Sequence, residues 1–208
     1  MKPVLRLALF SSFAWAATAI LASPACAQQI DVSAGGYTIS APAASAAFGN
    51  HEPQSLDAGI YPVFSADYLF HKRVGVQGEF SWDWAKPIYA PDFVNLPYKP
   101  FYYDFNAIYA SQLTKHHLGF ELLGGAGVQN TRFYVSACSG SSCFGTTNHL
   151  MIEGGGGIKY YFWRNFFFRP EGRYYFILHN VEFSSDHAIR YGASFGYTFR
   201  GDSRSGGK

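Results

Sequence analysis

The chain has 208 residues and is nearly neutral, with 16 Lys and Arg against 14 Asp and Glu. This balance excludes the strongly basic composition typical of a nucleic-acid-binding protein. Aromatic residues make up 19% of the chain, charged residues only 14%, and there are 22 glycines. Such a composition favours one domain built of many short, twisted β-strands.

Residues 1–27 have the pattern of a cleaved export signal. Lys2 and Arg6 precede an apolar run, and Ala25-Cys26-Ala27 predicts cleavage after its last alanine. Lipidation of Cys26 is the alternative, but the leucine expected three residues before an acylated cysteine is absent. Removal of the signal takes away two basic residues and no acidic one, so the mature chain is formally neutral.

Four stretches in the first half of the mature chain predict β-strands, at residues 30–40, 56–70, 74–84 and 101–113. The third, VGVQGEFSWDW, alternates without error between two faces. Its apolar face ends in Trp82 and Trp84, whereas its polar face carries Glu79 and Asp83. The first strand loses its alternation at Gly35-Gly36, which favours a β-bulge there.

The connections between these strands differ in length. Residues 71–73 form a tight turn, whereas residues 41–55 and 85–100 have no strand period and predict long loops. Prolines within 85–100 argue against a central strand there, because proline cannot donate a ladder hydrogen bond. The second strand is predicted to begin at Leu56, with this side chain on the apolar face.

Four further strands are predicted in the second half, at residues 118–129 with a continuation towards Tyr134, then at 150–162, 166–179 and 189–199. Short turns at 114–117 and 163–165 alternate with loops at 136–148 and 180–187. The polar face of the strand at 166–179 carries Arg169, Glu171, Arg173 and His179. All eight predicted strands therefore have one apolar and one polar face.

Cys138 and Cys143 lie in the Ser/Gly-rich loop at 136–148. In an exported chain this spacing predicts a disulfide that closes the tip of the loop. A metal site is the alternative, but the nearby ligand is His149 alone and structural zinc requires four ligands.

The alternation of long and short connections predicts an eight-stranded antiparallel transmembrane β-barrel with short periplasmic turns, long external loops and both termini in the periplasm. After the signal no segment reaches the roughly 18 apolar residues of a membrane helix. Aromatic residues are predicted at the two membrane interfaces: Trp82, Trp84, Tyr68, Phe70, Phe162, Phe166, Tyr197 and Phe199. A soluble ligand-binding barrel is disfavoured, since it would bury the charges in an apolar cavity.

The alternating strands, the stretch Arg169-Pro170-Glu171-Gly172-Arg173-Tyr174-Tyr175-Phe176 and the aromatic end of the last strand resemble the small outer-membrane barrels of the OmpA/OmpX-like and opacity-protein-like group. The resemblance covers residues 30–199 and implies a barrel domain at 28–199 with a short periplasmic tail at 200–208. It also implies that the barrel-assembly machinery reads the aromatic strand end at Phe199, although nine residues follow it.

An eight-stranded barrel is only wide enough for its own side chains to fill. The inner face is predicted to hold a salt-bridge network, because buried charges are stable only as pairs. The acidic members are Asp57, Asp67, Glu79, Asp83, Asp104, Glu121, Glu153 and Glu171. The basic members are Lys159, Arg169, Arg173 and Arg190.

Three patterns suggest catalysis, and each has a simpler explanation. Gly192-Ala193-Ser194-Phe195-Gly196 matches the nucleophile pattern G-x-S-x-G, but it lies within a strand and not at a strand-turn-helix elbow. His179, His187, Ser184 and Ser185 with Glu182 match lipid A deacylases in residue type alone. The glycine runs at 124–127 and 154–157 fit no phosphate-binding motif and indicate strand bends or a crowded lumen.

The sequence therefore predicts a bacterial outer-membrane barrel with a plugged lumen and a structural or surface-interaction role, without catalysis, cofactor or metal. The alternatives are a small cation-preferring pore and a lipid A-modifying enzyme. The expected partners are outer-membrane lipid and lipopolysaccharide, the barrel-assembly machinery, and an external ligand at the loops 41–55, 85–100 and 136–148.

Overall fold

The computed structural model describes residues 29–41, 56, 59–70, 73–89, 96–112, 117–134, 144–183 and 185–200. The predicted signal, Asp57, the two loop cysteines, Ser184 and the tail beyond Arg200 lie outside these ranges. Within the described ranges, no helix has the length and hydropathy required to cross a membrane.

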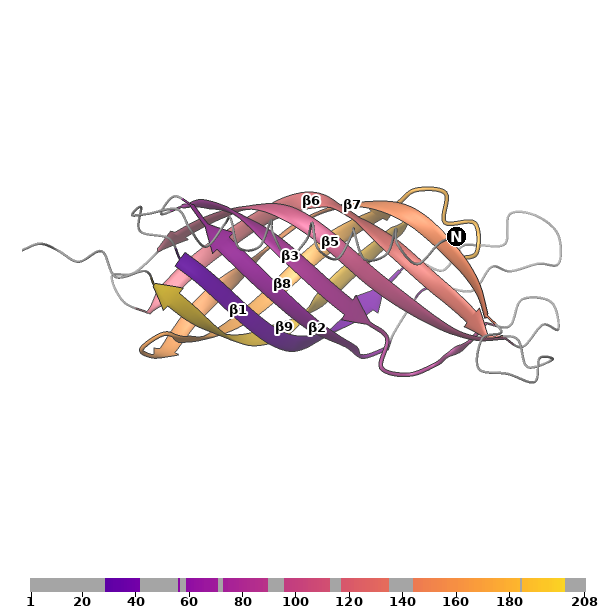
Figure 1. The fold of residues 1–208 in the computed structure, drawn as a ribbon, viewed down its shortest axis with the longest axis horizontal. Helices are drawn as coiled ribbons and strands as arrows, with labels where there is room; N and C mark the ends of the chain where they lie inside the picture. The colour runs from indigo at the N-terminus through magenta and orange to yellow at the C-terminus, as the bar shows by residue number, and fades with distance from the viewer. Residues whose placement is uncertain are drawn as a thin grey trace, which may run out of the picture.

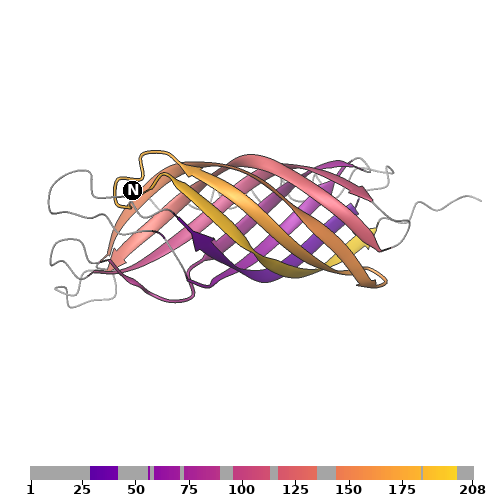
Figure 2. The same ribbon diagram turned by 180° about the vertical axis from the view of Figure 1, so that it is seen from behind.

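Eight long strands close into an antiparallel barrel, as predicted (Figures 1 and 2). They are β1 (Gln29–Ser40), β2 (Tyr61–Leu69), β3 (Val74–Trp82), β5 (Leu96–Gln112), β6 (Leu118–Tyr134), β7 (Phe144–Trp163), β8 (Phe166–Ile177) and β9 (His187–Arg200). Strands adjacent in the chain pair with one another, and β1 pairs with β9 to close the ring. The short β4 (Ile88–Tyr89) pairs with the beginning of β5.

The two ends of the barrel differ in their connections. We name the terminal end the one where β1 begins and β9 ends, at the left of Figure 1, and the loop end the opposite one. Connections at 70–73, 113–117 and 164–165 lie at the terminal end, and those at 41–60, 83–95, 135–143 and 178–186 at the loop end. Long and short connections therefore alternate as the sequence predicts.

The two faces of each strand meet opposite environments. In β8 the side chains of Arg169 and Arg173 are buried inside the barrel, whereas Tyr174 and Phe176 are exposed on its exterior. Many large apolar side chains are exposed in this way around the barrel, which in water would be a contiguous apolar surface of unusual size. The exterior is thus suited to lipid and not to water.

Aromatic side chains gather near both ends of the exterior. Towards the loop end the ring of Trp82 lies 6.0 Å from Phe64, and Trp84 is exposed beyond it. Towards the terminal end, the ring of Tyr197 lies 4.9 Å from that of Phe166 on the neighbouring β8 and 4.7 Å from that of Phe199 on its own strand. Other ring contacts at that end join Tyr68 to Phe70 at 6.4 Å and Phe162 to Phe166 at 6.5 Å.

The prediction of a β-bulge at Gly35-Gly36 is wrong. The pairing of β1 with both neighbours continues through these residues without a shift. The alternation in the sequence fades because the inward residues change from polar to apolar, and Tyr37 and Ile39 pack inside the barrel near the loop end.

The prediction that the prolines of 85–100 exclude a strand there is wrong, since β5 begins at Leu96. Pro97 lies one residue beyond the last pair that β5 forms with β6, Tyr98 with Phe133. Pro100 lies beyond the end of β3 and contributes its carbonyl, which accepts a hydrogen bond from the Asp83 N–H at 3.1 Å. Proline, which lacks an N–H, is tolerated where the neighbouring strand has no carbonyl that would accept that hydrogen bond.

Several other strand boundaries differ from the prediction. β2 begins at Tyr61, so Leu56 does not lie on an outer strand face but is buried in the apolar cluster at the loop end. β8 ends at Ile177, and His179 is exposed in a turn with a φ of 56° and does not face the lumen. β7 begins at Phe144, which makes the predicted loop 136–148 shorter.

The glycine run of β7 makes room for the lumen. Gly155 faces inward opposite Arg173, and a Cβ on it would lie 2.3 Å from the Gly172 carbonyl oxygen and 2.9 Å from Arg173 Cγ. Gly154 faces outward, where an added Cβ would meet its nearest atom at 3.9 Å. Small residues therefore occupy inward positions beside large charged ones.

We expect Gly155→Ala to lower the free energy of unfolding by about 1 to 3 kcal/mol, because it forces a methyl group against backbone. Gly154→Ala, one residue away on the opposite face, should leave stability nearly unchanged. Urea unfolding of the refolded protein in detergent, followed by tryptophan fluorescence, measures both. Equal stabilities for the two variants would contradict this account of the glycine run.

Candidate functional site

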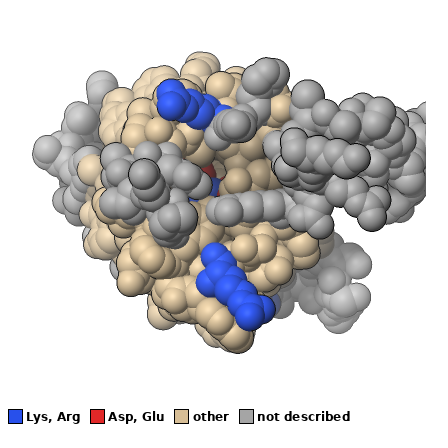
Figure 3. Space-filling view, turned by 90° about the vertical axis from the view of Figure 1, so that its left-hand side faces the viewer, with Lys and Arg blue, Asp and Glu red and all other residues tan. Residues whose placement is uncertain are grey.

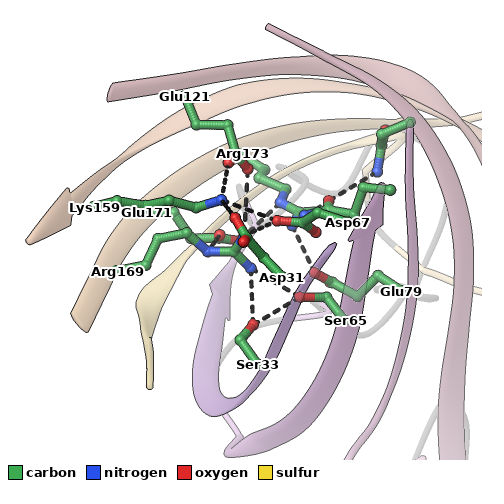
Figure 4. A network of polar contacts seen from close by, with 12 residues as sticks. Asp31, Ser33, Ser65, Asp67, Glu79, Glu121, Lys159, Arg169, Glu171 and Arg173 are labelled. Atoms are coloured by element: carbon green, nitrogen blue, oxygen red, sulfur yellow. Dashed lines mark hydrogen bonds and ion pairs between the residues drawn. The ribbon is translucent and has the colours of Figure 1, made fainter. Parts of the chain in front are cut away.

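The lumen contains the chemistry-bearing side chains of this protein, arranged in two linked clusters. The first cluster centres on Lys159 of β7 and Arg169 of β8 (Figure 4). Lys159 Nζ lies 2.7 Å from Asp31 and 3.1 Å from Asp67. It also lies 2.5 Å from Glu121. Arg169 shares two of these carboxylates, with Nη1 3.0 Å from Asp67 and 3.3 Å from Glu121.

The second cluster centres on Arg173 of β8 and Arg190 of β9. Arg173 Nη2 lies 2.6 Å from Glu79, and its Nη1 lies 3.4 Å from Glu153. Arg190 also pairs with Glu79 and donates a hydrogen bond to the Tyr175 hydroxyl at 2.5 Å. Both arginines are almost completely buried, so each cation depends on several partners to replace its lost hydration.

Glu171 joins the two clusters. Its Oε2 lies 2.9 Å from Arg169 Nε, and its Oε1 lies 2.8 Å from Arg173 Nε and 3.2 Å from Arg190 Nη2. One carboxylate thus neutralises parts of three guanidinium groups. Its loss would leave all three under-compensated in a closed interior.

Neutral side chains complete the network. Gln77 Nε2 donates to Asp67 at 2.8 Å, and its Oε1 accepts from Arg173 at 3.0 Å. Asn106 Nδ2 donates to Glu153 at 2.8 Å. These amides add hydrogen bonds between the first half of the barrel and the two clusters, beside the ion pairs of Asp67 and Glu79.

The structure brings most of the predicted lumen residues together, but two of them hold separate positions. Asp104 is buried and lies 3.8 Å from Arg173, and neither of its oxygens has a hydrogen-bond donor among the described residues. Asp83 lies just beyond β3 and accepts a hydrogen bond from the Ala85 N–H at 2.9 Å. Burial raises the pKa of the Asp83 carboxyl, and that hydrogen bond partly lowers it again.

Sequence reasoning missed Asp31, Gln77 and Asn106 as network members. Asp31 pairs with Lys159, although the two are separated by 128 residues in the chain. The available signal was the period of two, since all three residues occupy inward positions of their strands. The charge pattern alone did not distinguish the neutral Gln77 and Asn106, or the single aspartate Asp31, from other polar residues.

An apolar cap covers the network at the loop end. It consists of inward side chains from six strands and the adjoining segments: Ile39, Ala41, Leu56, Tyr61, Tyr98, Tyr102, Met151, Tyr175, Ile177, Phe183 and Ala188. Phe183 belongs to the connection between β8 and β9, and its ring lies 5.4 Å from that of Tyr98. His149 Nε2 lies 2.8 Å from Glu182 of the same connection. This connection therefore folds over the mouth of the barrel.

Apolar side chains also narrow the lumen towards the terminal end. Leu69, Ile108 and Leu123 form a second buried cluster, and the ring of Phe167 lies 5.7 Å from that of Tyr161. Figure 3, which faces this end, shows Lys and Arg at the rim and charged atoms deep in the centre. The charged network thus lies between two apolar clusters.

The residues that suggested catalysis are not arranged as a relay in the described part of the chain. Ser185 Oγ bonds the backbone of His187, whereas the His187 ring lies 2.5 Å from the Tyr174 hydroxyl. Gly192 and Ser194 lie within β9. Among the described residues, no group of three or more His, Cys, Asp or Glu is placed to hold a metal ion.

A closed antiparallel barrel with an apolar exterior and a charged, filled interior defines a membrane-spanning β-barrel protein. Residues 13–199 match the family model of the outer membrane protein beta-barrel domain. The chain belongs to this family of bacterial outer-membrane proteins.

Solved structures share this fold at low sequence identity. The N-terminal β-barrel domain of OprF from Pseudomonas aeruginosa is 18% identical, with a TM-score of 0.53 over 84% of this chain and 100% of that one. Neisserial surface protein A is 13% identical, with a TM-score of 0.56 over 83% of this chain and 97% of that one. Ail of Yersinia pestis, in complex with the heparin analogue sucrose octasulfate, is 14% identical, with a TM-score of 0.56 over 84% and 100%. No curated protein matches in sequence.

We expect Arg173→Ala to lower the free energy of unfolding by about 3 to 5 kcal/mol, because it leaves Glu79 and Glu153 buried without this cation. Arg73→Ala removes an equal charge from an exposed turn and should change stability by less than about 0.5 kcal/mol. Urea unfolding in detergent micelles measures both variants. An Arg173→Ala protein as stable as its parent would show that the network contributes nothing.

Proposed function

We propose that this protein is a closed outer-membrane barrel with a structural or surface-interaction role, and that it is neither a channel nor an enzyme. The observation that carries the proposal is the filled lumen. Eleven charged side chains from eight strands form ion pairs there, namely Asp31, Asp67, Glu79, Asp104, Glu121, Glu153, Lys159, Arg169, Glu171, Arg173 and Arg190. Apolar clusters lie at both ends of this network.

The loop end is proposed to face the exterior, and both termini the periplasm. The long connections at one end and the short turns at the other support this orientation, which is the rule for outer-membrane barrels. Residues 1–27 would then act as a cleaved signal, and the aromatic end of β9 at Phe199 would be read by the barrel-assembly machinery. A disulfide between Cys138 and Cys143 would restrain one external loop.

A small cation-preferring pore is the second candidate. The specific observation that favours it is the charge excess of the lumen, where seven paired carboxylates face four cations. An ion path would require these pairs and the loop-end cap to open together. The multiple bonds of each arginine support the closed form.

Planar-bilayer recordings test the closed lumen directly. We expect the refolded mature protein to give no discrete conductance steps, because the ion pairs and apolar clusters leave no continuous path for hydrated ions. A shift in gel mobility on boiling confirms in parallel that the barrel has folded. Discrete steps that change in size with Glu79→Gln would overturn the proposal and favour the pore.

Absence of catalysis has its own test. We expect lipid A from cells with and without the gene to have the same acyl profile by mass spectrometry, because Ser185 bonds backbone atoms of His187 and not its ring. Cells that express Ser185→Ala serve as the matched control. Loss of an acyl chain that depends on this protein and on Ser185 would show that the protein is a deacylase.

A further inference from the structure

Three basic side chains lie among aromatic rings on the exterior of the loop end. Arg132 of β6 lies 4.5 Å from the ring centre of Phe101, and Lys99 of β5 lies 5.8 Å from the same ring. Lys86 lies 4.3 Å from the ring centre of Tyr134, which in turn contacts Phe144 at 6.3 Å. We name these six residues the basic-aromatic patch.

The register of the sheet places two of these cations face to face. Lys99 of β5 is the direct cross-strand partner of Arg132 of β6, and both occupy outward positions. Like charges directly opposite one another destabilise a sheet. Phe101 offsets only part of that repulsion, because both cations share its ring.

No acidic side chain in the described ranges forms an ion pair with any of the three cations. The nearby Asp83 is buried on the inner side of the wall and accepts a hydrogen bond from the Ala85 N–H. Burial raises the pKa of the Asp83 carboxyl and the charge of Lys99 partly lowers it, but Asp83 and Lys99 do not form an ion pair. Inside the lumen, by contrast, every described cation is paired with carboxylates, as Arg173 and Lys159 are. Among the described residues, the patch therefore has an excess of positive charge that suits an anionic ligand.

The height of the patch indicates which anion would reach it. Phe101 pairs with Trp82 and contacts the loop-end aromatic group, where membrane headgroups begin. Lys99 and Arg132 lie two positions further towards the loop end, roughly 6 to 7 Å along the strands. In the proposed orientation, that level is where the phosphate groups of the surrounding lipid lie.

We propose that the basic-aromatic patch binds the phosphorylated headgroup of lipid A in the outer leaflet. Lys99 and Arg132 would hold one phosphate between them, and Lys86 would contact a second phosphate or the adjoining sugar, with Phe101 beneath the first site. The inference rests on the proposed outward orientation of the loop end. It is independent of whether the lumen conducts.

Native mass spectrometry of the micelle-embedded mature protein, titrated with bisphosphorylated lipid A, measures this binding. We expect Lys99→Gln and Arg132→Gln each to raise the dissociation constant about 5-fold and the double variant to raise it about 30-fold. These factors correspond to the loss of one and two charges near the membrane surface. Lys99→Arg should retain binding. Arg73→Gln, at the opposite end of the barrel, should bind as the parent does.

Competing probes distinguish the sources of anion. The parent protein should bind dephosphorylated lipid A as weakly as the double variant binds bisphosphorylated lipid A. The parent should also bind phosphatidylglycerol more weakly than lipid A. Equal binding by parent and double variant overturns the site, and equal binding of phosphatidylglycerol overturns its assignment to lipid A. Binding of sucrose octasulfate in preference to lipid A would instead make the patch a site for sulfated glycans.

Gel mobility with and without boiling shows whether each variant has folded. If the double variant fails to fold, Lys86→Gln provides the decisive measurement, because this residue lies outside the barrel wall strands. It should weaken lipid A binding about 5-fold. An unchanged dissociation constant for Lys86→Gln would then refute the site.

Discussion

Pairing of charge inside a ring too narrow for bulk water is the constraint on which this structure depends. Arg169, Arg173 and Arg190 are almost fully buried, and each is stable only because several oxygens replace its hydration. Glu171 serves all three, so the clusters behave as one unit. The cations come from the last three strands and most of their partners from earlier ones. The complete network therefore requires the closed barrel.

The same constraint explains the small residues of the wall. Gly155 stands opposite Arg173 because a methyl group at that position would collide with backbone. Apolar clusters at both ends keep the ion pairs in a low-dielectric interior, where they are strong if satisfied and costly if broken. This arrangement supports the proposal that the lumen is closed and that its charged residues stabilise the barrel.

The exterior of the loop end has a different arrangement of charge. Cations inside the wall all have carboxylate partners, whereas Lys99 and Arg132 face one another outside it above an aromatic ring. Lysine and arginine therefore occur in two different environments in this protein. The buried arginines stabilise the barrel through ion pairs, whereas Lys99 and Arg132 lie half-buried on the exterior beside an aromatic ring.

The sequence by itself determined the barrel, its eight strands and the inward or outward direction of most residues, because a period of two requires only local information. It did not reveal the continuous pairing of β1, the inward turn of Leu56 or the strand that begins at Leu96. Those features depend on which neighbouring strands and segments lie beside these residues in the folded barrel. Only the tertiary structure decided that Asp31 meets Lys159 and that Glu171 joins three arginines, since strand register and barrel closure set distances between residues remote in the chain.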